Sequence, residues 1–385
     1  ISVDNGICGG CGTCSAVCPS GAISYAYERG EDLIRRAQTL LTRYIDAGGK
    51  SPNLLIHDQT HGSEMIGAMA RYGRGLPGST LSMAVYSVTE IGHDLLASAL
   101  ATGAEHVTII CPPDRRDELE SLTGQKDLIK ALLAGLKFAQ SDRVHLIHET
   151  DPDAVEAALW DLGPDPLTDK SASKRAEALS VFEPVGGKRA VARTAFSKLR
   201  EAAPERLDIV TLPAGAPYGQ IAIDIAGCTL CLSCVSCCPA DALHDNPDRP
   251  QISFVETACL QCGLCVTTCP EKVISLEPRF NFTGAALSPE ILHEDEPAEC
   301  LRCGKPFGSK ATIERITEKL AGKHSMFFDD QRSSLIRMCD DCRVIAQSEF
   351  TKDPFVVGSR PQPRTTEEYL EAEKVLRETK KEEGR

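Results

Sequence analysis

The sequence lacks the features that mark several large classes of proteins. Its 385 residues contain no run of about 18 apolar residues, so no membrane-spanning helix is expected. The formal net charge is −13, which argues against binding to nucleic acid or to an anionic membrane surface. No G-x-G-x-x-G follows a predicted strand and no G-x4-G-K-S/T occurs, so dinucleotide and nucleotide binding have no motif support. Motifs for binding flavin, nicotinamide or molybdopterin are missing too. This chain is therefore not expected to convert a substrate by itself, and any such reaction is expected in a partner protein.

Cysteine, by contrast, is abundant. There are 18 cysteines, most of them in C-x2-C spacing. Disulfide scaffolds with many cysteines are usually short and secreted, so metal ligation in a reducing cytoplasm is the better interpretation of this long chain. The length suits two to four domains, and a hydrophobic fraction of 42% is typical of a globular protein. The first residue is Ile1 rather than Met, which leaves open whether the natural N-terminus is missing.

Two cysteine motifs occupy residues 228–239 and 259–270. Each reads C-x2-C-x2-C-x3-C-P, the signature of bacterial ferredoxins that bind two [4Fe-4S] clusters. Three cysteines two residues apart wrap a loop around three irons, and the fourth, followed by proline, points to the partner cluster. Zinc knuckles or a disulfide framework are the alternative, and two copies that both end in Cys-Pro argue against it.

This crossed arrangement assigns four thiols to each cluster. The first cluster is predicted to be held by Cys228, Cys231, Cys234 and Cys269. The second is predicted to be held by Cys259, Cys262, Cys265 and Cys238. Cys237 is left over and is expected to be a packed thiol.

A third copy of the motif stands within residues 1–28. Its cysteines are Cys8, Cys11, Cys14 and Cys18. A third [4Fe-4S] cluster is expected there, yet no partner half supplies a fourth ligand for the first three cysteines, and Cys18 would reach toward another cluster. Three explanations stay open: the missing half lies upstream, a distant thiol such as Cys111 completes the site, or the loop is a relic without metal.

Residues 50–162 alternate short apolar runs with helical periodicity. Strands are predicted at 53–57, 81–86, 106–111 and 143–148, and helices at 62–72, 89–100 and 119–140. Thr89 is the expected cap of the second helix, and Gly124 is expected to interrupt the third. Strands that alternate with helices predict a doubly wound α/β domain.

This segment resembles the small iron–sulfur subunit of methanogen hydrogenase–heterodisulfide reductase complexes. The resemblance rests on residues 74–77 (RGLP), the strand and helix that follow, and the strand ending at Cys111. That family binds a [2Fe-2S] cluster through several cysteines, of which only Cys111 has a counterpart here. Where the family has a C-x2-C, residues 57–60 read HDQT. The resemblance implies the fold and an electron-transfer setting, and the missing cysteines favour a docking platform without a cluster.

Residues 163–206 are rich in Pro, Lys and Ala and are expected to form a linker with a helix over about 189–202. Lys188, Arg189 and Arg193 make this segment basic. A solvated helix face is the expected role, and docking on an acidic partner is the alternative. Residues 207–285 then form the predicted ferredoxin domain.

Two further C-x2-C pairs lie within residues 295–350, on either side of a helix predicted over 309–320. The expected metal ligands are Cys300, Cys303, Cys339 and Cys342. The C-x2-C-G-x2-F form of the first pair is typical of zinc knuckles, so zinc is preferred and a further iron–sulfur cluster is the alternative. Zinc would staple the module, since it has no redox chemistry. Residues 351–385 are expected to be a charged tail containing an amphipathic helix.

The expected fold class is therefore α+β with several domains: a doubly wound α/β domain, a bacterial-ferredoxin-like dicluster domain and a small four-cysteine module. Cubane clusters pass one electron at a time, and several in one chain favour an electron-transfer subunit. The layout resembles iron–sulfur proteins that accompany molybdenum or tungsten formate dehydrogenases, hydrogenases and heterodisulfide reductases. The resemblance implies such an enzyme as partner, with no catalysis by this chain alone.

Two other functions remain open at this point. The chain could be an assembly or maturation factor for a metalloenzyme, in which the zinc module docks and the clusters are structural or sensing elements. It could instead be a cluster-bearing regulator. The acidic charge and the lack of a DNA-binding motif speak against the regulator.

Overall fold

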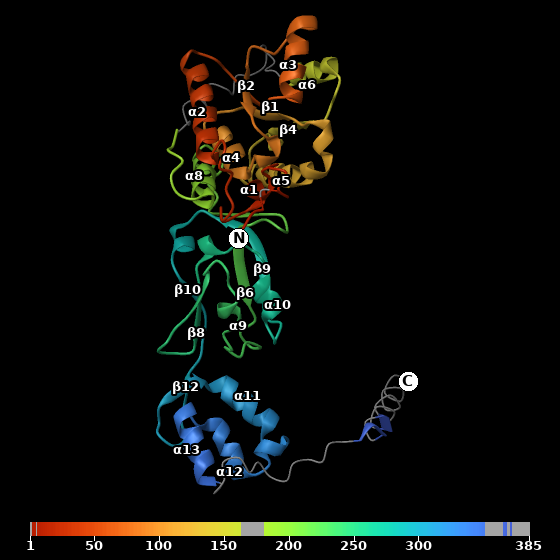
Figure 1. Ribbon diagram of the computed structural model, residues 1–385. Coiled ribbons are helices and arrows are strands. Elements are labelled where there is room, and N and C mark those ends of the chain that lie inside the picture. The colour runs from red at the N-terminus through yellow and green to blue at the C-terminus, as the bar shows by residue number, and fades with distance from the viewer. Residues whose placement is uncertain (1, 5, 163–180, 351–364, 368–369, 372–385) are drawn as a thin grey trace, which may run out of the picture. The chain divides into compact units, whose positions relative to one another are not determined.

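The computed structural model describes residues 2–4, 6–162, 181–350, 365–367 and 370–371 (Figure 1). The chain divides into two compact units. The first comprises Ile1–Cys228, Leu232–His244 and Ile252–Leu292, and the second comprises Thr229–Cys231, Asp245–Gln251 and His293–Arg385. Within the described ranges, no helix combines the length and the apolar character needed to cross a membrane.

A four-stranded parallel sheet lies in the first unit, with strand order β2-β1-β3-β4. The strands are β1 (Asn53–Asp58), β2 (Thr80–Val85), β3 (His106–Ile110) and β4 (Val144–Ile147). Each lies within a residue or two of its predicted position. All six residues of β1 are buried, as expected for a parallel strand that is covered on both faces.

Helices cover both faces of this sheet. On one face the core joins Leu54 and Ile56 of β1 to α2 (Gly30–Asp46), α4 (His93–Ala101), α5 (Leu119–Gly135) and α8 (Lys188–Glu201). On the other face a smaller core joins Leu55 to α3 (His61–Tyr72) and α6 (Pro152–Asp161), which lie side by side (Figure 1). Successive side chains of a strand point to opposite faces, which is why Leu54 and Leu55 belong to different cores.

Two helix predictions are wrong in detail. Helix α4 begins at His93, after Gly92, whereas Thr89 lies in the 3-10 turn η1 (Val88–Glu90). The Thr89 hydroxyl donates a hydrogen bond to the carbonyl of Cys11, 2.6 Å away, so it ties down the N-terminal loop and does not cap α4. Helix α5 runs without a break through Gly124, because its buried leucines outweigh the cost of about 1 kcal/mol for glycine in a helix.

The helix predicted over 189–202 is confirmed as α8, but the prediction of a solvated basic face is wrong. Val191, Ala192, Ala195, Phe196 and Leu199 are buried in the larger core. These apolar residues recur at helical spacing and form one face of α8, and this face packs into the core. The basic residues beside that face are therefore partly buried as well. Residues 163–180 of the predicted linker lie outside the described residues.

The two later cysteine motifs are framed by an antiparallel sheet of order β5-β9-β6. Its strands are β5 (Ile209–Thr211), β6 (Gly219–Ile223) and β9 (Ile274–Asn281). Each motif contains a short helix, α9 (Ser233–Ser236) or α10 (Leu264–Thr268), and the N-terminal motif contains α1 (Thr13–Val17). A further sheet has the order β10-β8-β7, formed by Glu290–Glu294, Gln251–Phe254 and Leu243–Asp245.

The second unit contains a small hairpin followed by helices. The hairpin pairs β11 (Pro297–Glu299) with β12 (Pro306–Ser309), and the helices include α11 (Lys310–Leu320), α12 (Asp330–Ser333) and α13 (Asp340–Phe350). Its buried apolar residues include Ala298, Leu335, Ile336 and Ala346, together with three cysteines. So small a core normally needs a metal or disulfides to be stable. Nearly all of the predicted tail lies outside the described residues.

The start of α11 offers a test of this unit's stability. Ser309 is the N-cap: its hydroxyl accepts a hydrogen bond from the amide of Thr312 and donates one to Asp295. We expect Ser309→Ala to lower the free energy of unfolding by about 1 kcal/mol, because a helix-terminal amide loses its partner. Urea unfolding followed by circular dichroism measures this. Thr317→Ala, within the same helix, is the control, and an equal loss in both variants would contradict the capping role.

Candidate metal centres

One cavity in the first unit is lined by four cysteines from two different motifs. They are Cys238, Cys259, Cys262 and Cys265. Apolar side chains, among them Ile221, Phe254 and Leu276, form the rest of its wall. These are the four thiols that the crossed arrangement assigns to the second cluster, with one cysteine brought in from the first motif. Four thiols around a largely apolar cavity are a donor set that fits a [4Fe-4S] cluster.

All three cysteine loops share one backbone shape. The residues directly before and after the second cysteine have positive φ in each loop: Gly10 and Gly12, Leu230 and Leu232, Gln261 and Gly263. Glycine adopts this conformation at no steric cost, whereas leucine does not, so the first motif holds a strained turn that its surroundings must stabilise. At Gly12 a β-carbon would also lie 2.5 Å from the β-carbon of Glu90, so this position requires glycine for a second reason.

Nitrogen donors reach two of the sulfurs in the cavity. Cys259 Sγ accepts hydrogen bonds from the amide and from the side chain of Gln261, both at 3.4 Å. Cys238 Sγ accepts one from the amide of Ala242 at 3.3 Å. Burial raises the pKa of the Cys265 thiol to about 11, and the neighbouring cysteines add to this shift. A bound metal removes that penalty, because thiols give up their protons on ligation.

The four residues assigned to the first cluster remain a prediction as a set. Cys234 is buried in α9, and Cys228 and Cys269 are half-buried. Cys231 is exposed and belongs, with Thr229 and Leu230, to the second unit. Cys237, outside both sets, places its sulfur 3.4 Å from the carbonyl of Cys234.

In the N-terminal loop, Cys8 and Cys14 are exposed, and Cys11 and Cys18 are half-buried. Burial would raise the pKa of the Cys18 thiol, but hydrogen bonds from Ser20 and the backbone lower it to about 7.

The distant thiol proposed for this loop is a core residue. Cys111 is 1% exposed, its sulfur lies 3.8 Å from the carbonyl of Ile109, and burial raises its pKa to about 12. A thiol in such surroundings resists ionisation, which speaks against Cys111 as the missing ligand.

Cys300, Cys303, Cys339 and Cys342 converge in the second unit, with their sulfurs all within 4.8 Å of one another. The sulfurs of Cys303 and Cys339 are 3.7 Å apart. In a tetrahedron with zinc–sulfur bonds of about 2.3 Å, sulfurs are about 3.8 Å apart. A cubane, which holds four irons, needs its ligands farther apart. The donor set therefore fits a single tetrahedral ion.

The burial and the hydrogen bonds of these four cysteines favour the binding of a cation. Cys300, Cys339 and Cys342 are buried, with Phe307 and Met338 packed against them. Burial opposes ionisation of Cys300, yet hydrogen bonds from backbone amides, including that of Cys339, lower its pKa to about 6. Burial and its three neighbours raise the pKa of Cys342 to about 12. Only a bound cation lets all four thiols ionise together.

Comparison with known proteins identifies the cysteine motifs. Residues 220–270 match a 4Fe-4S dicluster domain, and residues 1–24 match a 4Fe-4S binding domain. The chain carries ferredoxin-type 4Fe-4S domains. The ferredoxin-type protein NapH of Haemophilus influenzae is 33% identical over 86 residues, which cover 19% of this chain and 30% of that protein. The chain thus spans less than a third of the length of this relative.

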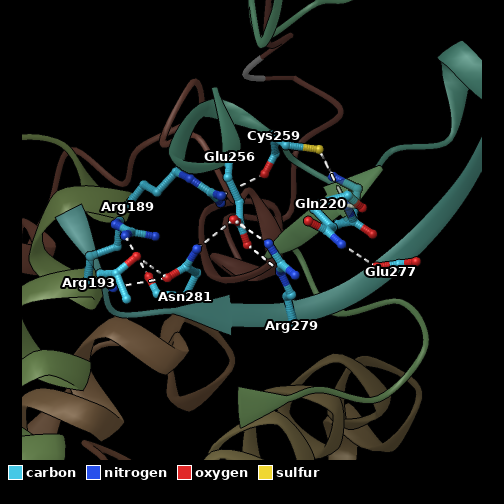
Figure 2. Close-up of polar contacts among 10 residues, drawn as sticks. Arg189, Arg193, Gln220, Glu256, Cys259, Glu277, Arg279 and Asn281 are labelled. Atoms are coloured by element: carbon cyan, nitrogen blue, oxygen red, sulfur yellow. Dashed lines mark hydrogen bonds and ion pairs between the residues drawn. The ribbon is translucent and has the colours of Figure 1, made fainter. Parts of the chain in front are cut away.

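Polar residues around the second motif were not found from the sequence (Figure 2). Glu256 accepts two hydrogen bonds from Arg279, at 2.8 and 2.9 Å, and one from Asn281 at 2.9 Å. Burial would raise the pKa of Glu256, but these donors lower it. Arg189 donates to the carbonyl of Cys259. It lies 70 positions away in the chain, and the only sequence signal for it was the local excess of positive charge.

Proposed function

We propose that this chain is an electron-transfer subunit that passes single electrons through [4Fe-4S] clusters to or from a partner oxidoreductase. The observation that carries the proposal is the cavity shared by Cys238 and three cysteines of the other motif. Crossed ligation of this kind places two clusters close together, as stepwise electron transfer requires. The ferredoxin-type matches over residues 1–24 and 220–270 support the same function.

The proposal assigns a third cluster to the N-terminal loop. Its backbone has positive φ at the same two positions as the two later loops, which favours cluster binding over a relic. The parallel sheet with helices on both faces serves as a doubly wound docking platform without a cluster. A formate dehydrogenase, hydrogenase or heterodisulfide reductase type of enzyme is the proposed partner, on the resemblance of the cysteine layout.

We assign a structural zinc ion to Cys300, Cys303, Cys339 and Cys342. The sulfur spacing supports a single ion, and the small apolar core of this unit supports a structural role. Zinc does not change its oxidation state, so it would not pass electrons between clusters. The second unit would instead offer a surface, stabilised by the ion, to which the partner binds.

Metal analysis of protein purified without oxygen tests the assignments. We expect about twelve irons with matching sulfide and about one zinc per chain. Electron paramagnetic resonance of the dithionite-reduced protein should show coupled [4Fe-4S] signals. Protein without iron would disprove the proposed function. Clusters that cannot be reduced and reoxidised reversibly would favour structural clusters in an assembly factor instead.

Electron donors identify the partner class. A catalytic amount of formate dehydrogenase with formate, or of hydrogenase with hydrogen, should bleach the visible absorbance of the clusters within the mixing time. The matched control is the same mixture with Cys262→Ser protein, which should accept fewer electrons per chain. If neither enzyme reduces the clusters, both of these proposed partners are contradicted. The iron content, measured separately, still tests whether the chain binds clusters.

A further inference from the structure

The first two residues of α8 contact two different cysteine loops. Lys188 reaches the N-terminal loop, and Arg189 reaches the loop of the second motif. All three segments belong to the first unit. Because the two side chains are neighbours in the sequence, a single helical turn holds loops that are more than 200 positions apart in the chain.

Lys188 is held deep in its site. Its ammonium donates hydrogen bonds to the carbonyls of Ser15, at 2.6 Å, and of Ala16, which lie between the third and fourth cysteines of the N-terminal motif. The side chain is 11% exposed and pairs with Asp94 at 3.8 Å. Burial lowers its pKa, whereas Asp94 and the sulfur of Cys18 act in the opposite direction. The charge thus lies against the segment that directly follows Cys14, a predicted ligand of the N-terminal cluster.

Each of the three guanidinium nitrogens of Arg189 donates to a backbone carbonyl, and Figure 2 shows the bond to Cys259. It donates to Thr257 at 2.7 Å, to Pro217 at 2.7 Å and to Cys259 at 2.6 Å. Its guanidinium lies 4.4 Å from the ring centre of Tyr218. These partners carry no formal charge, so the positive charge beside Cys259 is not cancelled by them. The contacts also fix the start of the second loop, where Cys259 enters the cavity.

Such charges act on clusters in a defined direction. Reduction adds one negative charge to a cluster, so a nearby cation stabilises the reduced form and raises the reduction potential. The effect is larger for half-buried charges than in water, because the local dielectric constant is lower. A carboxylate near the same cluster acts in the opposite direction.

We propose that Lys188 and Arg189 are positioning residues that clamp the N-terminal loop and the second-motif loop to α8 and raise the potentials of the clusters in both, which joins them into one relay. The inference rests on the proposed function, since it needs clusters in both loops. It adds two residues outside every cysteine motif and a specific link between the third cluster and the dicluster domain.

Redox titration monitored by electron paramagnetic resonance tests the clamp. At a fixed potential we expect Lys188→Gln to lower the reduced-to-oxidised ratio of the N-terminal cluster about tenfold, which for one electron is about 59 mV. Arg189→Gln should do the same to the second-motif cluster. Asp94→Asn should shift the N-terminal cluster the opposite way. Signals are assigned with a variant in which Cys8, Cys11 and Cys14 are serine.

Matched controls separate charge from general damage. Arg193→Gln changes an arginine one turn further along α8 that donates to Asn281, and Lys198→Gln changes a half-buried lysine paired with Glu201. Neither should shift a potential. Lys188→Arg keeps the charge and should restore the wild-type value.

Two results would overturn the clamp. One is unchanged potentials in Lys188→Gln and Arg189→Gln with full iron content. The other is a loss of iron from these variants that the two control variants show to the same extent. Loss of iron from only the loop that each residue faces would support the clamp. Wild-type protein without reducible clusters would instead disprove the proposed function.

Discussion

Replacing Cys238 with serine is expected to empty the cluster site of the second motif, although Cys238 belongs to the first motif. The side chain lines one cavity with Cys259, Cys262 and Cys265. Loss of one of four thiolates leaves an iron without a protein ligand, so about four irons should be lost while the first-motif cluster stays. Iron analysis combined with redox titration measures this, because the coupling between the two reduced clusters should vanish with the lost site.

The adjacent cysteine supplies a matched control. Cys237 has the same chemistry, yet it lies outside the predicted ligand sets, with its sulfur near the carbonyl of Cys234. We expect Cys237→Ser to keep its full iron content and both signals. Cys269→Ser should show the converse of Cys238→Ser and empty the first-motif site. Equal iron loss in Cys237→Ser and Cys238→Ser would contradict the crossed arrangement.

Replacing Cys339 with serine is expected to unfold the second unit and release its metal. Structural zinc binding contributes about 10–16 kcal/mol in small metal modules, and the described part of this unit buries few apolar side chains that could replace it. Helices α11 and α13 should lose their protection against hydrogen exchange, and zinc content should fall from about one per chain to zero. Treating wild-type protein with a strong chelator should produce the same loss.

The first unit provides an internal reference for this experiment. The iron content and redox signals of the second-motif and N-terminal clusters should not change when Cys339 is replaced, because their predicted ligands all lie in the first unit, whereas Cys231 of the first-motif cluster belongs to the second unit. Asp341→Ala is the matched control: it changes an exposed residue on α13 between two of the ligands and should retain zinc. A loss of about four irons and no zinc would show that this site holds a cluster instead.

The parts of the molecule that could be predicted from the sequence depend on local patterns. Cysteines two residues apart, followed by Cys-Pro, define a loop that needs few distant contacts. The four strands of the parallel sheet were also placed within a residue or two, because continuous apolar runs leave little choice of conformation. The four cysteines of the second unit lie with their sulfurs within 4.8 Å of one another, since each C-x2-C brings its own turn, and their metal stays a prediction.

The predictions that failed concern residues whose partners lie far away in the chain. Thr89 is a residue type that often caps helices, but its hydroxyl donates a hydrogen bond to the carbonyl of Cys11 instead. The basic start of α8 looks solvated, yet Phe196 and its neighbours draw that helix into the core. Gly124 was expected to interrupt α5, but the helix continues through it because one face of the helix is buried. For Thr89 and Gly124 a tertiary contact outweighs a local preference of about 1 kcal/mol.

By itself the sequence determined the chemistry of this protein, because metal-ligand type and spacing are short-range properties of the chain. The tertiary structure alone decided which charges lie beside which loops. Lys188 reaches Ser15, and Arg189 reaches Cys259, only because the buried face of α8 sets the direction in which its first turn points. Such a direction follows from the whole core, and no local pattern encodes it.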